Sequence, residues 1–290
     1  MDLEKLEQIK RTALIALFSD DDLMDSLVLK GGSALDMVYN IAQRSSLDLD
    51  FSIPTEFRAE TIPDVTKKIR RVLWENFRDK GYEAFDIDFR EVPENATTST
   101  PDFWGGYLVE FKVIEIGKYK NLLSDPRVLR VNALEAGPDH QRKFKVSISK
   151  FEYCDPKKEV DLDDYTVYVY TPEMIVFEKL RAICQQIPEY LPNSTQTARA
   201  RDFFDIYTVI ENFKIDLRSP QNSDLLKNIF AAKEVPLSLI GKIEQYKEYH
   251  RADFVSVEAT LKPNTKLYTF DFYFNYVIDK CEALKPLWEK

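Results

Sequence analysis

Histidine and cysteine are scarce in this chain, and their scarcity excludes several kinds of chemistry. The 290 residues include two histidines and three cysteines. His140 and His250 have no metal-ligand spacing, so we expect both at the surface. The cysteines are odd in number and form no C-x-x-C pair, which argues against a disulfide framework and a zinc site. With only two histidines, catalysis by a histidine base is disfavoured, and chemistry by carboxylates and a metal ion is favoured.

Long apolar runs are missing as well. No run approaches the roughly 20 residues that a membrane-spanning helix needs. The first 18 residues are charged and amphipathic, without the basic start and uninterrupted apolar core of a signal peptide. Hydrophobic residues make up 44% and charged residues 31%, a globular composition. We therefore expect a cytoplasmic protein that does not act at a membrane, with one large or two ordinary domains.

An excess of positive charge is also lacking. The net charge is −9, whereas proteins that grip nucleic acid along an extended surface are usually basic. This weakens the case for an RNA substrate, although a local basic patch can bind the end of an RNA. A helix expected at 62–80 is rich in basic residues, but acids intervene and we expect a solvated face. Its basic residues are Lys67, Lys68, Arg70, Arg71, Arg78 and Lys80.

The stretch from Leu27 to Ile53 organises the rest of the chain. A short apolar run leads into two glycines, and a helical pattern follows from about 34 to 42. From Leu47 to Ile53, apolar residues alternate with polar ones, the period of a half-buried strand. Asp48 and Asp50 therefore lie on the same face of that strand.

This spacing points to a metal ion and a phosphate. Two carboxylates as close as Asp48 and Asp50 repel each other unless a cation lies between them, and oxygen ligands of this kind suit Mg²⁺. Gly31 and Gly32 permit a tight turn, and Ser33 is a good N-cap for the helix that follows. Free N–H groups at a helix N-terminus form an anion site.

The remaining patterns indicate an α+β fold. Helices are expected at 2–18 and 62–80, and strands at 82–92, 107–116 and 144–151, which together predict a mixed β-sheet with packed helices in residues 1–160. The acidic stretch 155–165 marks the expected domain boundary. Residues 161–290 are expected to be mainly helical, after a short strand at 166–170, with helices at 172–186, 197–213, 222–232, 236–249 and 267–284.

Two separated motifs resemble those of a known family. A glycine turn, a short helix and a D-x-D strand are similar to the first motif of the DNA polymerase β-like nucleotidyltransferases. More narrowly, the chain resembles the AbiEii/AbiGii family of toxin nucleotidyltransferases. The first match comprises Lys30, Gly31, Gly32, Ser33, Ala34, Leu35, Arg44, Ser46, Asp48, Asp50 and Phe51. The second comprises Glu173, Lys179, Leu180, Arg181, Ala182, Arg201, Asp202, Asp205 and Ile206.

The resemblance implies a set of roles. It implies that Asp48 and Asp50 hold Mg²⁺, that Lys179 contacts nucleotide phosphates, and that Asp202 acts at the catalytic centre. The nucleotide-binding residues that it implies are Lys30, Gly31, Gly32, Ser33, Arg44, Arg181, Arg201 and Asp205. It further implies an NTP as substrate, an RNA acceptor such as a tRNA 3′ end, and a cognate antitoxin as partner.

One position departs from the family pattern. Ser147 stands where a later strand of the sheet usually carries a third carboxylate, and a serine cannot replace a charged metal ligand. Glu152, Asp155 or Asp86 could substitute, and the sequence does not choose between them. Two alternatives therefore stay open: a catalytically degenerate nucleotide-binding module, and a nucleotidyltransferase that modifies a protein or a small molecule.

Overall fold

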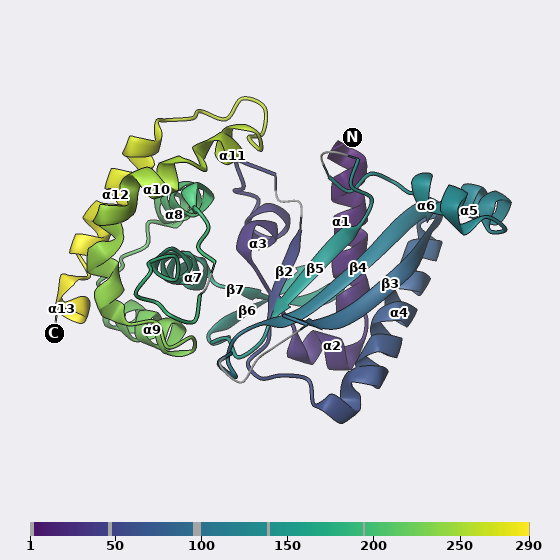
Figure 1. The fold of residues 1–290 in the computed structure, drawn as a ribbon, viewed down its shortest axis with the longest axis horizontal. Coiled ribbons are helices and arrows are strands. Elements are labelled where there is room, and N and C mark those ends of the chain that lie inside the picture. Colours follow the sequence, from purple (N-terminus) through teal and green to yellow (C-terminus); the bar gives the residue numbers. More distant parts are fainter. Residues whose placement is uncertain (1–2, 46–47, 95–99, 138–139, 194, 290) are drawn as a thin grey trace.

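Seven strands form one mixed sheet at the centre of the molecule (Figure 1). The computed structural model describes the whole chain except residues 1–2, 46–47, 95–99, 138–139, 194 and 290. The strand order is β3-β4-β5-β2-β1-β7-β6. The β2–β5 and β1–β7 pairs are parallel, and the other pairs are antiparallel. The strands are β1 (Val28–Lys30), β2 (Leu49–Ser52), β3 (Tyr82–Val92), β4 (Gly106–Glu115), β5 (Phe144–Ser149), β6 (Lys157–Leu162) and β7 (Tyr165–Tyr170).

Helices cover the sheet and continue into a helical C-terminal part. One face carries α1 (Leu3–Phe18), α2 (Asp21–Ser26) and α4 (Ile62–Asp79), while α3 (Gly31–Met37) follows β1 directly (Figure 1). Two short helices, α5 (Ile116–Leu122) and α6 (Pro126–Val131), project beyond β3 and β4. The C-terminal helices are α7 (Pro172–Cys184), α8 (Ala200–Phe213), α9 (Pro220–Ala231), α10 (Lys247–Arg251), α11 (Phe254–Glu258), α12 (Phe270–Glu282) and α13 (Lys285–Trp288), with the 3₁₀ helices η1 (Ala59–Thr61) before α4 and η2 (Leu237–Tyr246) after α9. This arrangement confirms the expected α+β class.

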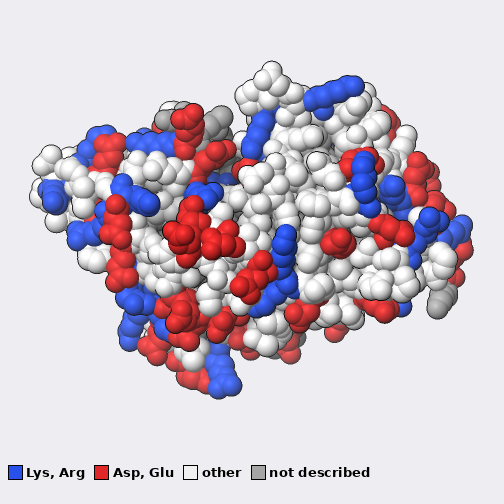
Figure 2. Space-filling view, turned by 180° about the vertical axis from the view of Figure 1, so that it is seen from behind, with Lys and Arg blue, Asp and Glu red and all other residues white. Residues whose placement is uncertain are grey.

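The α4 helix shows how the sequence sets the packing. Five of its apolar residues are buried and form one stripe that faces the sheet and α1, namely Val65, Ile69, Val72, Leu73 and Phe77. Most of its basic residues are paired with acids, among them Arg71 with Asp20 at 2.6 Å and Arg78 with Glu83 at 2.7 Å, whereas Arg70 donates to the backbone carbonyl of Ile87. Over the face that Figure 2 shows, basic and acidic side chains likewise alternate. The α4 charges are therefore largely neutralised, as expected for a solvated face.

Three local expectations differ from the structure. The charged stretch at 155–165 contains the strand β6, which the sequence does not announce because β6 is an edge strand that pairs only with β7 and tolerates charge. The expected domain boundary at residue 160 falls inside β6, so the sheet extends to Tyr170, and the division into two domains stays a prediction. The irregular stretch expected at 121–138 contains α6, and the helix expected at 236–249 is mostly the 3₁₀ helix η2.

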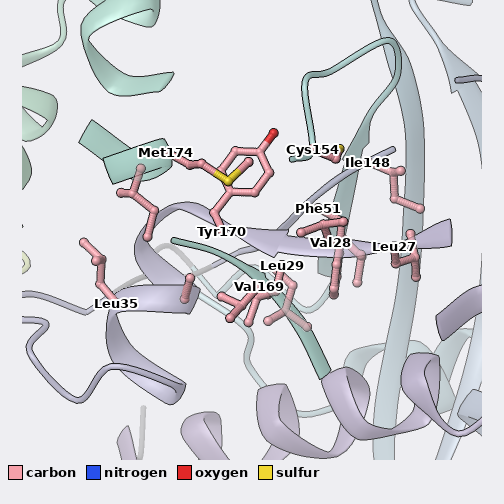
Figure 3. Close-up of a cluster of buried hydrophobic side chains, with 14 of the residues drawn as sticks. Leu27, Val28, Leu29, Leu35, Phe51, Ile148, Cys154, Val169, Tyr170 and Met174 are labelled. Carbon is pink, nitrogen blue, oxygen red and sulfur yellow. The ribbon is translucent and has the colours of Figure 1, made fainter. Parts of the chain in front are cut away.

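The central strands are anchored by a dense apolar cluster (Figure 3). Leu29 of β1, Phe51 of β2 and Val169 of β7 are fully buried. The hydroxyl of the buried Tyr170 donates to Ser52 Oγ at 2.8 Å, which ties β7 to β2. The cluster fixes the strand ends that carry the polar side chains of the site.

Across the described ranges, no helix combines the length and apolar character that a bilayer crossing requires.

Candidate active site

A polar cleft of about 920 Å³ opens between the central strands and the helices α7 and α8. All of the residues that the sequence predicts for the site line this cleft except Ser33 and Asp205. The lining residues include Lys30, Gly31, Gly32, Arg44, Asp48, Asp50, Ser147, Glu152, Glu178, Lys179, Arg181, Arg201, Asp202 and Lys233. Two motifs separated by more than a hundred residues therefore meet in one place.

The two aspartates lie at the start of β2. Asp50 is a half-buried residue of the strand, and Asp48 is more exposed and comes just before it. Loss of hydration in the cleft raises the pKa of both carboxyl groups. The charges of Asp48 and Glu178 raise the pKa of Asp50 further, while Lys30 opposes them. The site thus holds carboxylates under mutual repulsion. Ser46 and Leu47, which the sequence also assigns to this motif, lie outside the described residues.

The glycine turn allows a close approach to Asp50. Gly31 has a φ of +64°, a left-handed conformation that favours glycine. A Cβ atom at this position would lie 3.2 Å from Asp50 Oδ2, which is tighter than an ordinary contact. The glycine therefore leaves the carboxylate room beside the backbone.

Ser33 has a different role from the N-cap that we expected. The helix α3 begins at Gly31, and its N-cap is Lys30, without a side-chain capping bond. The fully buried Ser33 donates its hydroxyl to the backbone carbonyl of Asp48 at 2.7 Å. The expectation was wrong because the left-handed Gly31 lets the helix begin two residues earlier. Ser33 instead fixes the backbone that presents Asp48.

A second group of charges joins the two parts of the chain. Arg44 forms a bidentate pair with Asp205 of α8, at 2.9 and 2.5 Å. Lys179 of α7 lies 2.7 Å from Asp205 and 3.0 Å from Asp202. Burial by itself would raise the pKa of Asp205. The charges of Arg44 and Lys179 outweigh this effect and lower the pKa to about 2. Arg201 does not join this group; its Nε donates to Ser256 Oγ at 2.9 Å.

Asp202 is the less constrained of the two α8 carboxylates. Its Oδ1 accepts a hydrogen bond from Lys179, while its buried Oδ2 accepts no hydrogen bond from the described residues and lies 3.7 Å from an Arg199 nitrogen. A buried acceptor that lacks a hydrogen bond is costly and calls for an explanation. Asp202 is one of the residues that line the cleft.

A buried ion cluster forms the floor of the cleft. Arg181 donates to both oxygens of Glu152, at 2.7 and 3.2 Å. The ammonium of Lys30 lies 3.3 Å from Glu178 and 3.7 Å from Glu152. Lys233 lies 3.6 Å from Glu152 and donates to the backbone carbonyls of Phe103 and Lys150. Arg181 thus serves Glu152, and the sequence missed Lys233 because no local pattern marks it.

Glu178 was also missed, although a signal existed. The signal is its position directly before Lys179 in the second motif. The family pattern assigns no role to this position, so we assigned it none. The structure places its half-buried side chain in the cleft, beside Lys30 and near Asp50.

Ser147 lies where the family pattern predicts a third acid. It is the register partner of Asp50 in the parallel β2–β5 pair and lines the cleft. The substitutes that we considered do not replace it there: Glu152 is bound by Arg181, and Asp86 lies on β3 with Lys112 and Arg130. Asp155 is not among the cleft residues. Within the described part of the chain, no cluster of three or more histidine, cysteine or acidic side chains could hold a metal ion.

His250 lies in the interior, contrary to our expectation. Its side chain is fully buried behind Asp202 and Phe203, and its Nδ1 accepts the backbone N–H of Arg199 at 3.1 Å. Burial lowers its pKa to about 4, so the ring is neutral near neutral pH. It supports the start of α8 and thereby the position of Asp202. His140 is exposed, as expected.

The mixed sheet, the glycine turn and the two neighbouring aspartates are the arrangement that the sequence predicts for a nucleotidyltransferase. More narrowly, residues 12–276 match the family described as "Nucleotidyl transferase AbiEii toxin, Type IV TA system". The chain belongs to this family, which confirms the resemblance seen in the sequence. A comparison with curated proteins gives no match.

Three solved structures are similar to this chain at low sequence identity. A candidate nucleotidyltransferase from H. pylori is 15% identical, with a TM-score of 0.50 and coverage of 98% of this chain and 95% of that chain. JHP933 from Helicobacter pylori is 16% identical, with a TM-score of 0.49 and coverage of 98% and 92%. An antigenic nucleotidyltransferase-like protein from Paracoccidioides brasiliensis is 16% identical, with a TM-score of 0.38 and coverage of 78% and 92%. The first of these similarities supports the fold alone.

Proposed function

We propose that this protein moves a nucleotide from an NTP to an acceptor hydroxyl with the help of Mg²⁺. The observation that carries the proposal is the meeting of Asp48 and Asp50 with Lys179 and Asp202 in one polar cleft. In the reaction, the acceptor oxygen forms a bond to the α-phosphorus. The bond from that phosphorus to the oxygen bridging the β-phosphate breaks, and pyrophosphate leaves.

Asp48 and Asp50 fit a divalent cation. They are two oxygen donors on one strand end, and dehydration and mutual repulsion raise the pKa of Asp50, as expected where a cation is to be bound. Gly31 leaves space beside Asp50 Oδ2. When bound, Mg²⁺ would offset the negative charge of the NTP phosphates.

The helical part supplies the proton acceptor. Among the described residues no donor reaches Asp202 Oδ2, and Lys179 holds the other oxygen at 3.0 Å. In the proposed reaction the Asp202 carboxylate takes the proton of the attacking hydroxyl. Lys179 is also a positive charge that the NTP phosphates could meet in the cleft. Its ammonium is already in ion pairs with Asp202 and Asp205. Burial raises the pKa of Asp48, and the charge of Arg201 partly opposes that rise, so Arg201 is a second cation near the proposed metal ligands.

An RNA end suits the acceptor side better than an extended duplex. The net charge is −9, and most basic residues of α4 are paired with acids, so an extended binding surface for nucleic acid has little support. A single-stranded end, such as a tRNA 3′ end, presents one hydroxyl and few phosphates to the cleft. As a member of a type IV toxin–antitoxin family, the protein is proposed to act as a toxin with a cognate antitoxin.

A second candidate function rests on Ser147. Ser147 lies beside Asp50 on the neighbouring strand, at the position where a third acid is expected. Because that acid is missing, the site is also compatible with a module that binds a nucleotide without transferring it. A protein or a small molecule as acceptor is the third possibility, which the acidic net charge favours over RNA.

Calorimetry with each NTP and Mg²⁺ tests the proposal first. We expect Mg²⁺-dependent binding of at least one NTP, and loss of that binding in Asp48→Asn and Asp50→Asn. The matched control is Asp88→Asn, because Asp88 belongs to the other D-x-D sequence, on β3, and has a side chain 54% exposed. Equal binding by all four proteins would overturn the metal assignment.

Transfer is then followed with labelled NTPs, tRNA and lysate fractions. We expect label on tRNA, with Asp202→Asn slowing transfer by about 10²–10⁴-fold while NTP affinity is kept. Label on protein or small molecules instead would replace the RNA acceptor. NTP binding without transfer to any fraction would establish the degenerate module.

A further inference from the structure

Three side chains form a row across the central strands at the mouth of the cleft. Lys30 of β1 is the register partner of Asp50 of β2, and Asp50 is in turn the partner of Ser147 of β5. Register partners project from the same face of a sheet, about 5 Å apart. The order across the row is therefore cation, carboxylate and hydroxyl.

The Lys30 side chain does not stay on its own strand. Its ammonium donates to Ser149 Oγ on β5 at 3.1 Å, so the side chain crosses β2 to the side of Ser147. Ser149 follows Ser147 by two residues and shares its face of the sheet. The positive charge thus lies close to the position where the family pattern places a third metal-binding acid.

The carboxylates around Lys30 hold the ammonium in place. Glu178 lies 3.3 Å away and Glu152 3.7 Å away, and Lys30 itself is 7% exposed. Glu152 is already engaged by Arg181. A buried ammonium with such partners stays charged, so Lys30 is a fixed cation beside Asp50.

Resting on the proposed function, we infer that the cleft binds one divalent cation, at Asp48 and Asp50, and that Lys30 supplies the second positive charge beside Asp50. A serine at position 147 leaves a second cation without its carboxylate, and the ammonium occupies that side of the site. Lys30 then meets the NTP phosphates with a permanent charge that needs no metal.

The number of bound cations tests this inference directly. Calorimetry with Mn²⁺, in the presence of a non-hydrolysable NTP analogue, is expected to give one ion per chain for the wild type and two for Ser147→Asp. Ser147→Asn is the control, because asparagine has the size of aspartate but no charge. This variant is expected to bind one ion per chain. Two ions in the wild type, or one in Ser147→Asp, would overturn the inference. No binding of Mn²⁺ or analogue by a folded wild type would instead overturn the proposed function.

Substitution of Lys30 provides the second arm. We expect Lys30→Met to weaken binding of the analogue by about tenfold without changing the Mn²⁺ count, and Lys30→Arg to restore most of the affinity. In the Ser147→Asp background, where a second ion replaces the charge, Lys30→Met should cost about threefold or less. Equal losses in both backgrounds would show that Lys30 has only a structural role. The ion count does not depend on whether Lys30→Met folds.

Discussion

Single carboxylates in this cleft differ in what their surroundings let them do. Asp205 is bound on both oxygens by Arg44 and Lys179, whereas Asp202 shares only one oxygen with Lys179. A carboxylate with both oxygens engaged is fixed in place, and one with an open oxygen can accept a proton. The neighbours in the fold, rather than the residue type, therefore separate a structural aspartate from a candidate base.

Removal of the Asp205 charge is expected to destabilise the protein. Asp205→Asn leaves Arg44 and Lys179 buried with less compensation, so we expect a loss of about 3–5 kcal/mol in the free energy of unfolding. Urea denaturation measures it. Asp216→Asn is the control, because the Asp216 side chain is 68% exposed beside Arg218, and it should change stability by less than about 0.5 kcal/mol. A loss below about 1 kcal/mol for Asp205→Asn would contradict the assignment.

The buried His250 gives the stability a defined pH dependence. Its pKa is lowered to about 4 in the folded state, against about 6.5 in an unfolded chain. Between these values the unfolded chain binds the proton more readily, so stability falls as the pH falls through this window. The loss from this group amounts to about 3 kcal/mol when pH 4 is reached.

Comparison with a variant isolates this contribution. We expect the difference in unfolding free energy between wild type and His250→Asn to shrink as the pH is lowered from about 7 to about 4, because asparagine keeps an acceptor but does not titrate. His140→Asn, at the exposed histidine, should give a difference that is flat with pH. A flat difference for His250→Asn would show that the histidine is not buried and neutral.

At the scale of elements, the β1–α3–β2 segment joins the parts of the proposed metal site. The turn at Gly31 brings the start of α3 against Asp50, and Ser33 ties α3 to the backbone of Asp48. The position of both aspartates therefore depends on how tightly this turn closes.

An alanine at the turn tests this dependence. Gly31→Ala is expected to cost about 1–2 kcal/mol for the left-handed backbone and to weaken Mn²⁺ binding, because its Cβ crowds Asp50. Gly81→Ala is the matched control, since Gly81 has a φ of +81° with no atom within 4 Å of the added Cβ. It should lose similar stability and keep Mn²⁺ affinity. Unchanged Mn²⁺ affinity in Gly31→Ala would show that the turn does not shape the metal site.

For the whole molecule, the distribution of charge limits how the proposed RNA acceptor could bind. Most basic residues on α4 are paired with acids, while unlike charges are interspersed over the face of Figure 2. The cleft, in contrast, gathers several cations, namely Lys30, Arg44, Lys179, Arg181, Arg199, Arg201 and Lys233. Recognition should therefore be confined to the end of an RNA.

Salt dependence measures the number of phosphates that are contacted. With about two phosphates of a single strand, the tRNA affinity should fall about sevenfold when the salt rises fourfold. Neutralising Lys67, Arg70 and Lys80 together should leave the dissociation constant nearly unchanged. A loss of about 10³-fold, as expected for many phosphate contacts, would show instead that RNA lies along an extended surface.

Local patterns were enough to predict most elements and the motif that carries Asp48 and Asp50. Period-two alternation predicted β2, β3, β4 and β5 because each has one buried face, and the stripe of α4 predicted its packing. The edge strand β6 was not predicted, because it lacks an alternating apolar pattern and charged residues are tolerated at the edge of a sheet. Ser33 was misassigned because its partner, the carbonyl of Asp48, is 15 residues away.

By itself, the sequence determined the family, the α+β class and the strand that presents the two aspartates, because these depend on neighbours along the chain. Only the tertiary structure decided that Arg44 binds Asp205, that Lys30 crosses to β5, and that His250 is buried. Those contacts join residues from 51 to 161 positions apart. These contacts depend on the order of the strands in the sheet and on how the helices pack against one another and beside the sheet, which no local periodicity encodes.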